Sequence, residues 1–148
     1  MKLMKRLLVC VIGAAFIALG TVGVAYAQDC LGSPATIVGT EGNDILTGTS
    51  GDDVIVGLGG NDLIKGMGGS DTICGGDGND VIDGGPGNDL LKGQFGDDRI
   101  VAGDGNDIVE GGPGNDMLDG GDGYDTLKGQ AGYDECYNGE ANSGCEIK

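Results

Sequence analysis

A nine-residue period is the feature that most constrains this chain. From Gly39 to Tyr137 the sequence divides into eleven consecutive units of nine residues, without insertion or deletion. Position 4 of every unit is glycine and position 6 is aspartate, while position 8 is aliphatic except in the last unit, where it is Cys136. Self-similarity at a short fixed period is typical of a solenoid, in which each unit packs only against its neighbours.

Each unit has two halves with different local preferences. Positions 1 to 6 are rich in Gly, Asn and Asp, which favour turns. Positions 7 to 9 are largely β-branched or aliphatic, and they predict a strand of about three residues. Two turns and two strands make a coil of about 18 residues. The sequence therefore predicts an all-β fold, a parallel β-roll (a two-sheet β-helix or solenoid) of tandem nonapeptides.

Residues 18 apart lie above one another in such a fold, at the interstrand spacing of roughly 4.8 Å. Position 8 is expected to point inward and to form two facing columns. One column comprises Leu46, Ile64, Ile82, Ile100 and Leu118, and the other comprises Ile55, Ile73, Leu91, Val109 and Leu127. Because side chains alternate along a strand, the apolar residues of position 7 are expected to point outward. They either reflect strand propensity alone or form a surface that contacts a partner or a second copy of the chain.

The aspartates of position 6 are predicted to stack along the two edges of the roll. Asp44, Asp62, Asp80, Asp98, Asp116 and Asp134 share one edge, and Asp53, Asp71, Asp89, Asp107 and Asp125 share the other. Carboxylates stacked in this way repel one another unless a cation lies between them. Calcium accepts carboxylates and backbone carbonyls in flexible geometry, whereas magnesium demands octahedral coordination. Zinc is disfavoured because the chain has no His and its cysteines are not clustered.

Two units show a resemblance to a known family most clearly. Residues 75–83 have the sequence GGDGNDVID and residues 111–119 have GGPGNDMLD. Both resemble the RTX, or haemolysin-type, calcium-binding repeat GGxGxDxUx. The resemblance implies calcium ions between successive turns, held by the position-6 aspartates and by turn carbonyls. Pairing each unit with the second unit after it allows up to about nine Ca²⁺ ions.

The charge of the chain also points toward cations. Beyond residue 27 the sequence contains all 24 Asp and Glu but only five Lys and Arg, a net charge of −19. This charge argues against nucleic acid and anionic membrane surfaces as partners. Because the 34 glycines make folding entropically costly and the core is small, we expect a chain that folds only as calcium binds.

Residues 1–27 have the pattern of a secretory signal peptide. A cationic start precedes an apolar run from Leu7 to Gly20, and a small-x-small cleavage site ends at Ala27. A single membrane anchor is the alternative. No later segment is apolar and long enough to span a bilayer, so we expect a secreted mature chain without a membrane span.

The ends of the repeat array are expected to be capped. Residues 28–38 form the predicted N-terminal cap, 39–137 the roll and 138–148 the C-terminal cap. Four cysteines follow the predicted cleavage site, which in a secreted chain favours disulfides over free or metal-bound thiols. Of the three possible pairings we favour Cys136–Cys145, which closes a short loop. Cys30–Cys74 would then tie the N-terminal cap to the fourth unit.

Three classes of function remain to be weighed. Paired carboxylates could hydrolyse glycosides, but the repeat explains every position-6 aspartate, and the sequence has no HExxH or GxSxG motif. An ice-binding roll would need a regular outward Thr-x-Asn array, which the variable position 3 does not provide. We therefore expect no enzyme but a structural, adhesive or interaction module, whose protein or cell-surface partner the sequence leaves open.

Overall fold

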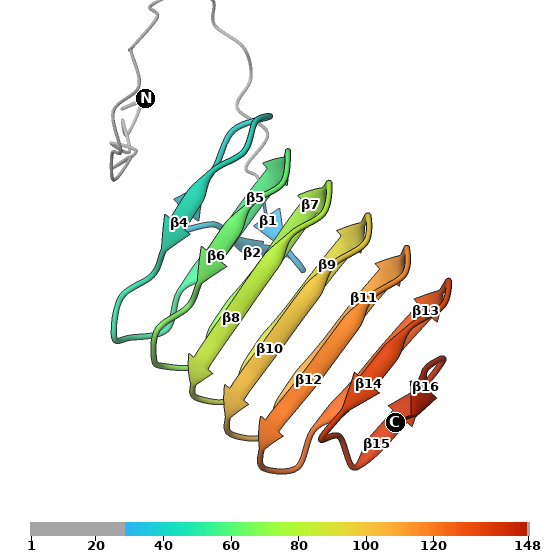
Figure 1. Ribbon diagram of the computed structural model, residues 1–148. Helices are drawn as coiled ribbons and strands as arrows, with labels where there is room; N and C mark the ends of the chain where they lie inside the picture. Colours follow the sequence, from blue (N-terminus) through green and yellow to red (C-terminus); the bar gives the residue numbers. More distant parts are fainter. Residues whose placement is uncertain (1–28, 148) are drawn as a thin grey trace, which may run out of the picture.

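The computed structural model describes residues 29–147, and the predicted signal peptide lies outside them. These residues form a parallel β-solenoid of two facing sheets, in which strands alternate between the sheets along the chain (Figure 1). The predicted fold class is confirmed. Among the residues that the structure describes, no helix is long and apolar enough to cross a membrane.

Each sheet has seven strands, and every neighbouring pair in it is parallel. The first sheet comprises β4 (Ile45–Thr47), β6 (Leu63–Lys65), β8 (Val81–Pro86), β10 (Arg99–Asp104), β12 (Met117–Asp122), β14 (Glu135–Tyr137) and β16 (Glu146–Ile147). The second comprises β3 (Ile37–Val38), β5 (Val54–Gly59), β7 (Thr72–Asp77), β9 (Leu90–Phe95), β11 (Ile108–Pro113), β13 (Thr126–Ala131) and β15 (Ala141–Ser143). Ile82 pairs with Ile100, and Ile73 with Leu91, so the coil of about 18 residues is also confirmed.

The strands are longer than the sequence predicted. Only β4, β6 and β14 have the expected three residues among the repeat strands, whereas β5 and β7 to β13 have six. The longer strands continue through positions 1 to 3 of the next unit, where Gly76 still pairs with Gln94 and Asp77 with Phe95. Glycine carries no side chain that would prevent close backbone pairing, so the true turn shrinks to positions 4 to 6.

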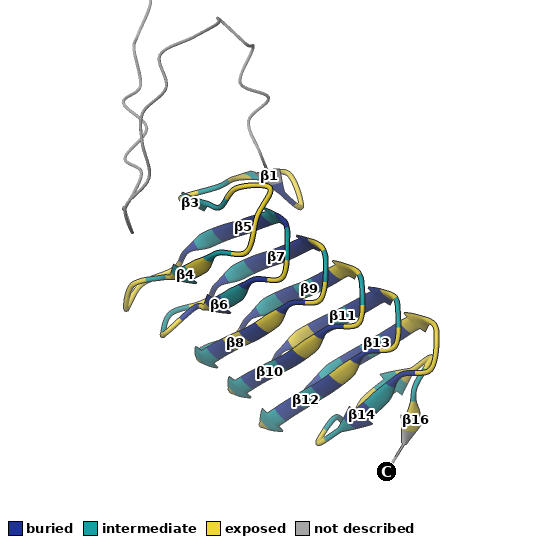
Figure 2. Cartoon of the chain, turned by 45° about the horizontal axis from the view of Figure 1, so that its top comes forward, coloured by how far each residue is buried: buried dark blue, intermediate teal, exposed yellow. Residues whose placement is uncertain are grey.

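The core is the narrow space between the two sheets, and buried residues recur as dark blue segments along the strands of both sheets (Figure 2). The position-8 side chains fill it, and from Ile55 to Cys136 all of them are completely buried. Leu46 and Ile37 are partly buried at the N-terminal end. Most repeat strands therefore contribute one large apolar side chain to the core, and hydrophobic burial per residue is small.

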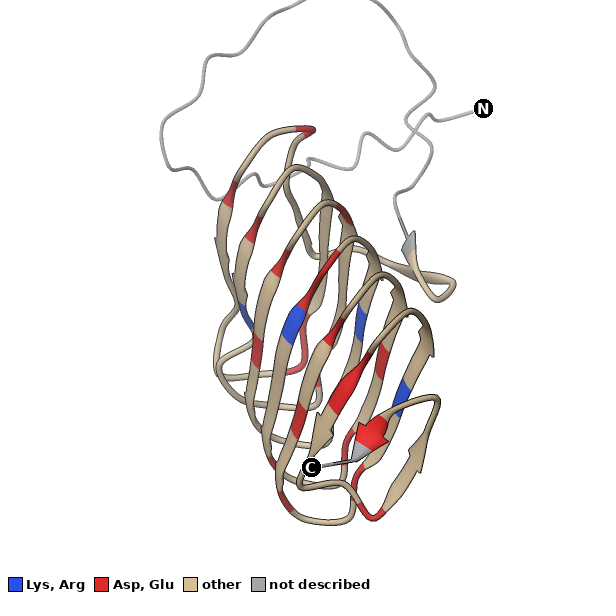
Figure 3. Cartoon of the chain, turned by 45° about the vertical axis from the view of Figure 1, so that its right-hand side comes forward, with Lys and Arg blue, Asp and Glu red and all other residues tan. Residues whose placement is uncertain are grey.

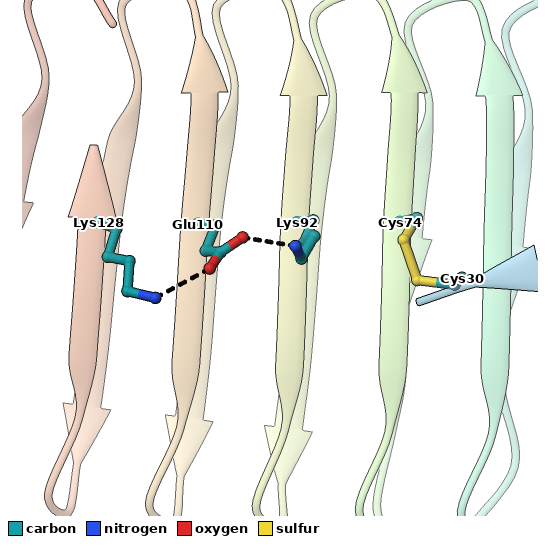
Figure 4. A network of polar contacts seen from close by, with 5 residues as sticks. All are labelled: Cys30, Cys74, Lys92, Glu110 and Lys128. Carbon is teal, nitrogen blue, oxygen red and sulfur yellow. Dashed lines mark hydrogen bonds and ion pairs between the residues drawn. A yellow bond between two sulfur atoms is a disulfide. The ribbon is translucent and has the colours of Figure 1, made fainter. Parts of the chain in front are cut away.

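The hairpin that precedes the repeats covers part of the outer face of the second sheet. β1 (Asp29–Cys30) and β2 (Ser33–Pro34) form an antiparallel hairpin, and β1 contacts β5 and β7. Cys30 forms a disulfide with Cys74 on β7 (Figure 4), and both pack with Val56 in a small second core. After the hairpin, Ile37 of β3 pairs with Ile55 of β5 and continues the inner column.

A second disulfide and a row of ion pairs complete the framework. Cys136 is bonded to Cys145, so both disulfides join the pairs that the sequence favoured. On the outer face of the second sheet, Glu110 lies between Lys92 and Lys128, with oxygen–nitrogen distances of 2.5 and 3.0 Å (Figure 4). The hydrogen bond from Lys92, followed by that from Lys128, lowers the pKa of Glu110. These contacts link three adjacent strands.

Candidate metal centre

The position-6 aspartates lie in the turns, immediately before the strands of the repeat units, and acidic residues recur from coil to coil in Figure 3. All of them from Asp53 to Asp134 are buried, with between 1% and 7% of each residue exposed. Asp44, in the first unit, is half-buried. Charged groups are rarely buried unless they are paired, so each carboxylate needs a partner.

One oxygen of these carboxylates is held by the preceding coil. The backbone amide of Asp80 donates to Oδ1 of Asp98 at 2.8 Å, and the amide of Asp98 donates to Oδ1 of Asp116 at 2.9 Å. The same bond joins nine pairs that are 18 residues apart, from Asp44–Asp62 to Asp116–Asp134. The predicted site residues are thus joined within each of the two columns.

The other oxygen has no hydrogen-bond partner among residues 29–147 in most units. The nine aspartates with such a buried Oδ2 are Asp62, Asp71, Asp80, Asp89, Asp98, Asp107, Asp116, Asp125 and Asp134. Leaving an ionised carboxylate oxygen buried without compensation costs several kcal/mol in order of magnitude. A bound cation or a proton would remove that cost.

A backbone carbonyl oxygen lies close to the free carboxylate oxygen in most of these units. A β-carbon built on Gly84 would lie 2.5 Å from Oδ2 of Asp89 and 2.6 Å from the carbonyl oxygen of Ala102, in the next coil. Carboxylate and carbonyl oxygens therefore converge at position 1, which is glycine in every unit except the eighth, where it is the small residue Ala102. Within the described part of the chain, no three His, Cys, Asp or Glu side chains form a metal-binding group. A cation here would need the carbonyls as well, and this all-oxygen donor set fits calcium.

The first coil differs from the others. Oδ2 of Asp44 accepts hydrogen bonds from the backbone amide and Oγ1 of Thr40, at 2.6 and 2.9 Å. Thr49 makes the same two bonds to Asp53, at 2.7 and 2.9 Å. Of the eleven predicted metal ligands, these two therefore have their second oxygen satisfied by the protein itself. The threonine at position 2 is a sequence signal that distinguishes these units, since later units have Gly, Leu, Met or Gln there.

A second ladder, which the sequence interpretation missed, lies beside the first. Oδ1 of Asn61 accepts a hydrogen bond from the amide of Asn79 at 2.8 Å, and Oδ1 of Asn79 accepts from the amide of Asp97 at 3.0 Å. Each position-5 side chain thus accepts from the amide of the following coil, whereas each position-6 side chain accepts from the amide of the preceding coil. The recurrent Asn or Asp at position 5 was the signal. Tyr124 and Tyr133 occupy this position at the end of the array and donate their amides to the last asparagines.

Burial raises the pKa values of the central aspartates. It is the largest cause in each case, and it raises the pKa of Asp98 to about 7 and those of Asp80, Asp89 and Asp116 to about 6. The pKa values of Asp62, Asp71 and Asp107 are raised for the same reason. The amide hydrogen bond opposes this effect in each case, and neighbouring carboxylates add to it. Without a cation, the folded roll therefore favours protonated aspartates.

We expect acid to stabilise the metal-free roll. Each raised pKa lies above the unfolded value of about 3.9, so its contribution to the free energy of unfolding is fully present below that pH. The contribution is lost as pH rises through about 6 to 7. Far-UV circular dichroism of the calcium-free chain should show β-structure increasing on acidification, with a midpoint in this window. A midpoint near pH 4 would instead indicate relief of repulsion between ordinary surface carboxylates.

A parallel β-solenoid edged by buried aspartates and convergent carbonyls belongs to the class of cation-binding repeat proteins. The sequence model of the RTX calcium-binding nonapeptide repeat matches residues 36–64, 47–82, 57–91, 75–109, 83–118, 92–127 and 110–142. The chain therefore belongs to the RTX calcium-binding nonapeptide repeat family, and it is a calcium-binding repeat protein. No curated protein matches the sequence.

Proposed function

We propose that this chain is a secreted, non-enzymatic protein whose repeat array folds on calcium binding and then acts as a structural, adhesive or interaction module. The observation that carries the proposal is the set of nine buried Oδ2 atoms without a hydrogen-bond partner in residues 29–147. Membership of a calcium-binding repeat family supplies the identity of the cation.

The proposed ligands are the position-6 aspartates together with carbonyl oxygens of the glycine-rich turns. The nine with a free Oδ2 are the principal ligands, and up to about nine ions follow from the nine bonded pairs. Asp44 and Asp53 contribute less, because Thr40 and Thr49 already bind their second oxygen. Calcium would supply positive charge to offset the net charge of −19 beyond residue 27.

Two features support an extracellular location. Residues 1–27 have the pattern of a signal peptide. Both disulfides also fit an oxidising compartment. The role as an interaction module draws on the apolar side chains of position 7 that are exposed on the outer faces, namely Ile45, Val81, Ile108 and Met117. Catalysis gains no support from the aspartate ladder, since Oδ1 of each bonded carboxylate is committed to a backbone amide.

Asp98→Asn tests the proposed ligands. Asparagine keeps Oδ1 as an acceptor and places an amide in the region where Oδ2 and the carbonyl oxygen of Gly111 converge. The variant should therefore bind at least one ion fewer than the parent chain, while its metal-free fold should be no less stable. If about 3 kcal/mol of calcium stabilisation is lost over about nine ions, the calcium midpoint should rise about twofold.

Native mass spectrometry would count the ions, and circular dichroism would give the midpoint. Asp104→Asn is the matched control, because Asp104 is an exposed carboxylate at position 3 and its replacement changes the net charge equally. The proposal requires the two variants to differ. Equal ion counts and midpoints would remove the position-6 aspartates from the site, and absence of calcium binding by the parent chain would remove the function.

A further inference from the structure

The tail that follows the repeats carries a carboxylate in the place of a missing aspartate. β15 pairs with β13 so that Ala141 lies opposite Thr126, an offset of 15 residues. Between the repeat strands the offset is 18, as for Ile108 and Thr126. Because Asp125 immediately precedes Thr126, its counterpart in the last half-coil is Glu140. The tail is thus three residues shorter than a coil but places an acid at the same register.

The backbone amide of Asp125 binds Glu140 in the same way as the amides of earlier aspartates bind the next aspartate of their column. Its amide donates to Oε2 of Glu140 at 2.7 Å, and the corresponding bond from Asp107 to Oδ1 of Asp125 measures 2.9 Å. The amides of Glu140 and Ala141 both donate to the carbonyl oxygen of Asp125 at 3.1 Å. The additional methylene of glutamate allows the carboxylate to reach this amide across the shortened turn.

The carbonyl oxygen that lies near most of the free carboxylate oxygens is present here too. A β-carbon built on Gly120 would contact the carbonyl oxygen of Asn138 and lie 2.6 Å from Oδ2 of Asp125. Asn138 follows Gly120 by the usual 18 residues, although it lies outside the repeats. Asp125 is 1% exposed, and its Oδ2 has no hydrogen-bond partner among the described residues. A buried, unpartnered carboxylate oxygen thus faces the tail.

The other column ends differently and provides an internal comparison. β16 pairs with β14 so that Glu146 lies opposite Glu135, which places Cys145 opposite Asp134. Cys145 is bonded to Cys136 and supplies no carboxylate. One column therefore ends in a glutamate, whereas the other ends in a disulfide. The same disulfide closes the loop that contains Glu140.

We propose that Asp125, Glu140 and the carbonyl oxygen of Asn138 form an additional calcium site, outside the nonapeptide repeats, at the C-terminal cap. The inference rests on the proposed function, because it uses the same donor chemistry. The site adds one ion to those between successive repeats, and it binds the tail to the last coil. Because Glu140 is exposed, the site is open to solvent on one side.

Glu140→Gln is the test, and Asp122→Asn is its control. Glutamine is nearly isosteric and keeps an acceptor for the amide of Asp125, whereas Asp122 is an exposed acid at position 3 of the preceding turn. Titration of calcium into the purified chain, followed by native mass spectrometry, should show one ion fewer for Glu140→Gln and the parent number for Asp122→Asn. Calcium should also slow reduction of Cys136–Cys145 in the parent chain, and it should slow it less in Glu140→Gln.

The outcomes separate this inference from the proposed function. If the parent chain binds several ions and Glu140→Gln binds the same number with unchanged disulfide protection, the cap site is wrong and the repeat sites stand. If the parent chain binds no calcium, both fail. Circular dichroism at saturating calcium should give the parent spectrum for both variants, and loss of that spectrum in Glu140→Gln alone would mean that Glu140 acts as a structural cap rather than a calcium ligand.

Discussion

Removal of calcium should unfold most of the repeat array, and restoring it should refold the array cooperatively in the millimolar range. Each ion that binds only the folded roll contributes about 1.4 kcal/mol when calcium is tenfold above its dissociation constant. About nine sites would then contribute about 13 kcal/mol, comparable with the whole stability of a typical domain, about 5–15 kcal/mol. The narrow core contains one buried aliphatic side chain in most repeat strands, so hydrophobic burial offers little to replace the free energy of calcium binding.

Far-UV circular dichroism during a calcium titration measures this transition. A chelator should reverse it, and magnesium at the same concentration should not reproduce it, because magnesium dehydrates reluctantly and requires octahedral geometry. The disulfides remain intact in both states, so the change reports calcium alone. An unchanged β-sheet spectrum in chelator would show that the core and disulfides suffice, and calcium-driven folding would then be wrong.

Gly105→Ala should be among the most damaging single substitutions in the turns. Gly105 stands at position 4 with a φ of +148°, and a β-carbon there would overlap the carbonyl oxygen of Gly87 in the preceding coil. The left-handed conformation alone costs a residue with a side chain about 1–2 kcal/mol, and separation of the coils adds to it. We expect the free energy of unfolding in saturating calcium to fall by about 3 kcal/mol or more, measured with urea.

Gly51→Ala is the matched control for this substitution. Gly51 occupies the same position 4 in the first coil, but its φ lies outside the left-handed range and its nearest neighbour would be Thr49 Oγ1, at 3.9 Å. The free energy of unfolding should therefore change by less than about 1 kcal/mol. Equal losses for the two alanine variants would show that helical or turn propensity, rather than contact between coils, governs position 4.

The period of the sequence predicts the fold because one apolar residue recurs at a fixed phase. Once position 8 is placed inside, the spacing of nine determines the two columns, and Ile82 and Ile100 pair as expected. Strand length could not be derived in this way, because glycine has low strand propensity and the pairing of Gly76 with Gln94 depends on backbone contact between coils. Local preference was overridden there by the stacking of the repeats.

The candidate site was predictable in composition but not in detail. The repeated aspartate identifies the columns, yet only the structure separates its anchored Oδ1 from its free Oδ2. The bonds from Thr40 to Asp44 depend on the turn conformation of the first coil. The nine-residue period could not identify Glu140 as a site residue, because the tail departs from the spacing of nine. Only the pairing of β15 with β13 shows that Glu140 lies at the end of the Asp125 column.

The two hydrogen-bond ladders have a consequence for how such a chain can change length. Both the position-5 and the position-6 bonds join residues 18 apart, and they run in opposite directions. Duplication or deletion of 18 residues between Cys74 and Cys136 would therefore keep both columns, both disulfides and both ends on their own sides of the roll. A change of nine would move one cap to the opposite sheet. Evolution can thus vary the number of coils freely in whole turns, while the two ends stay fixed.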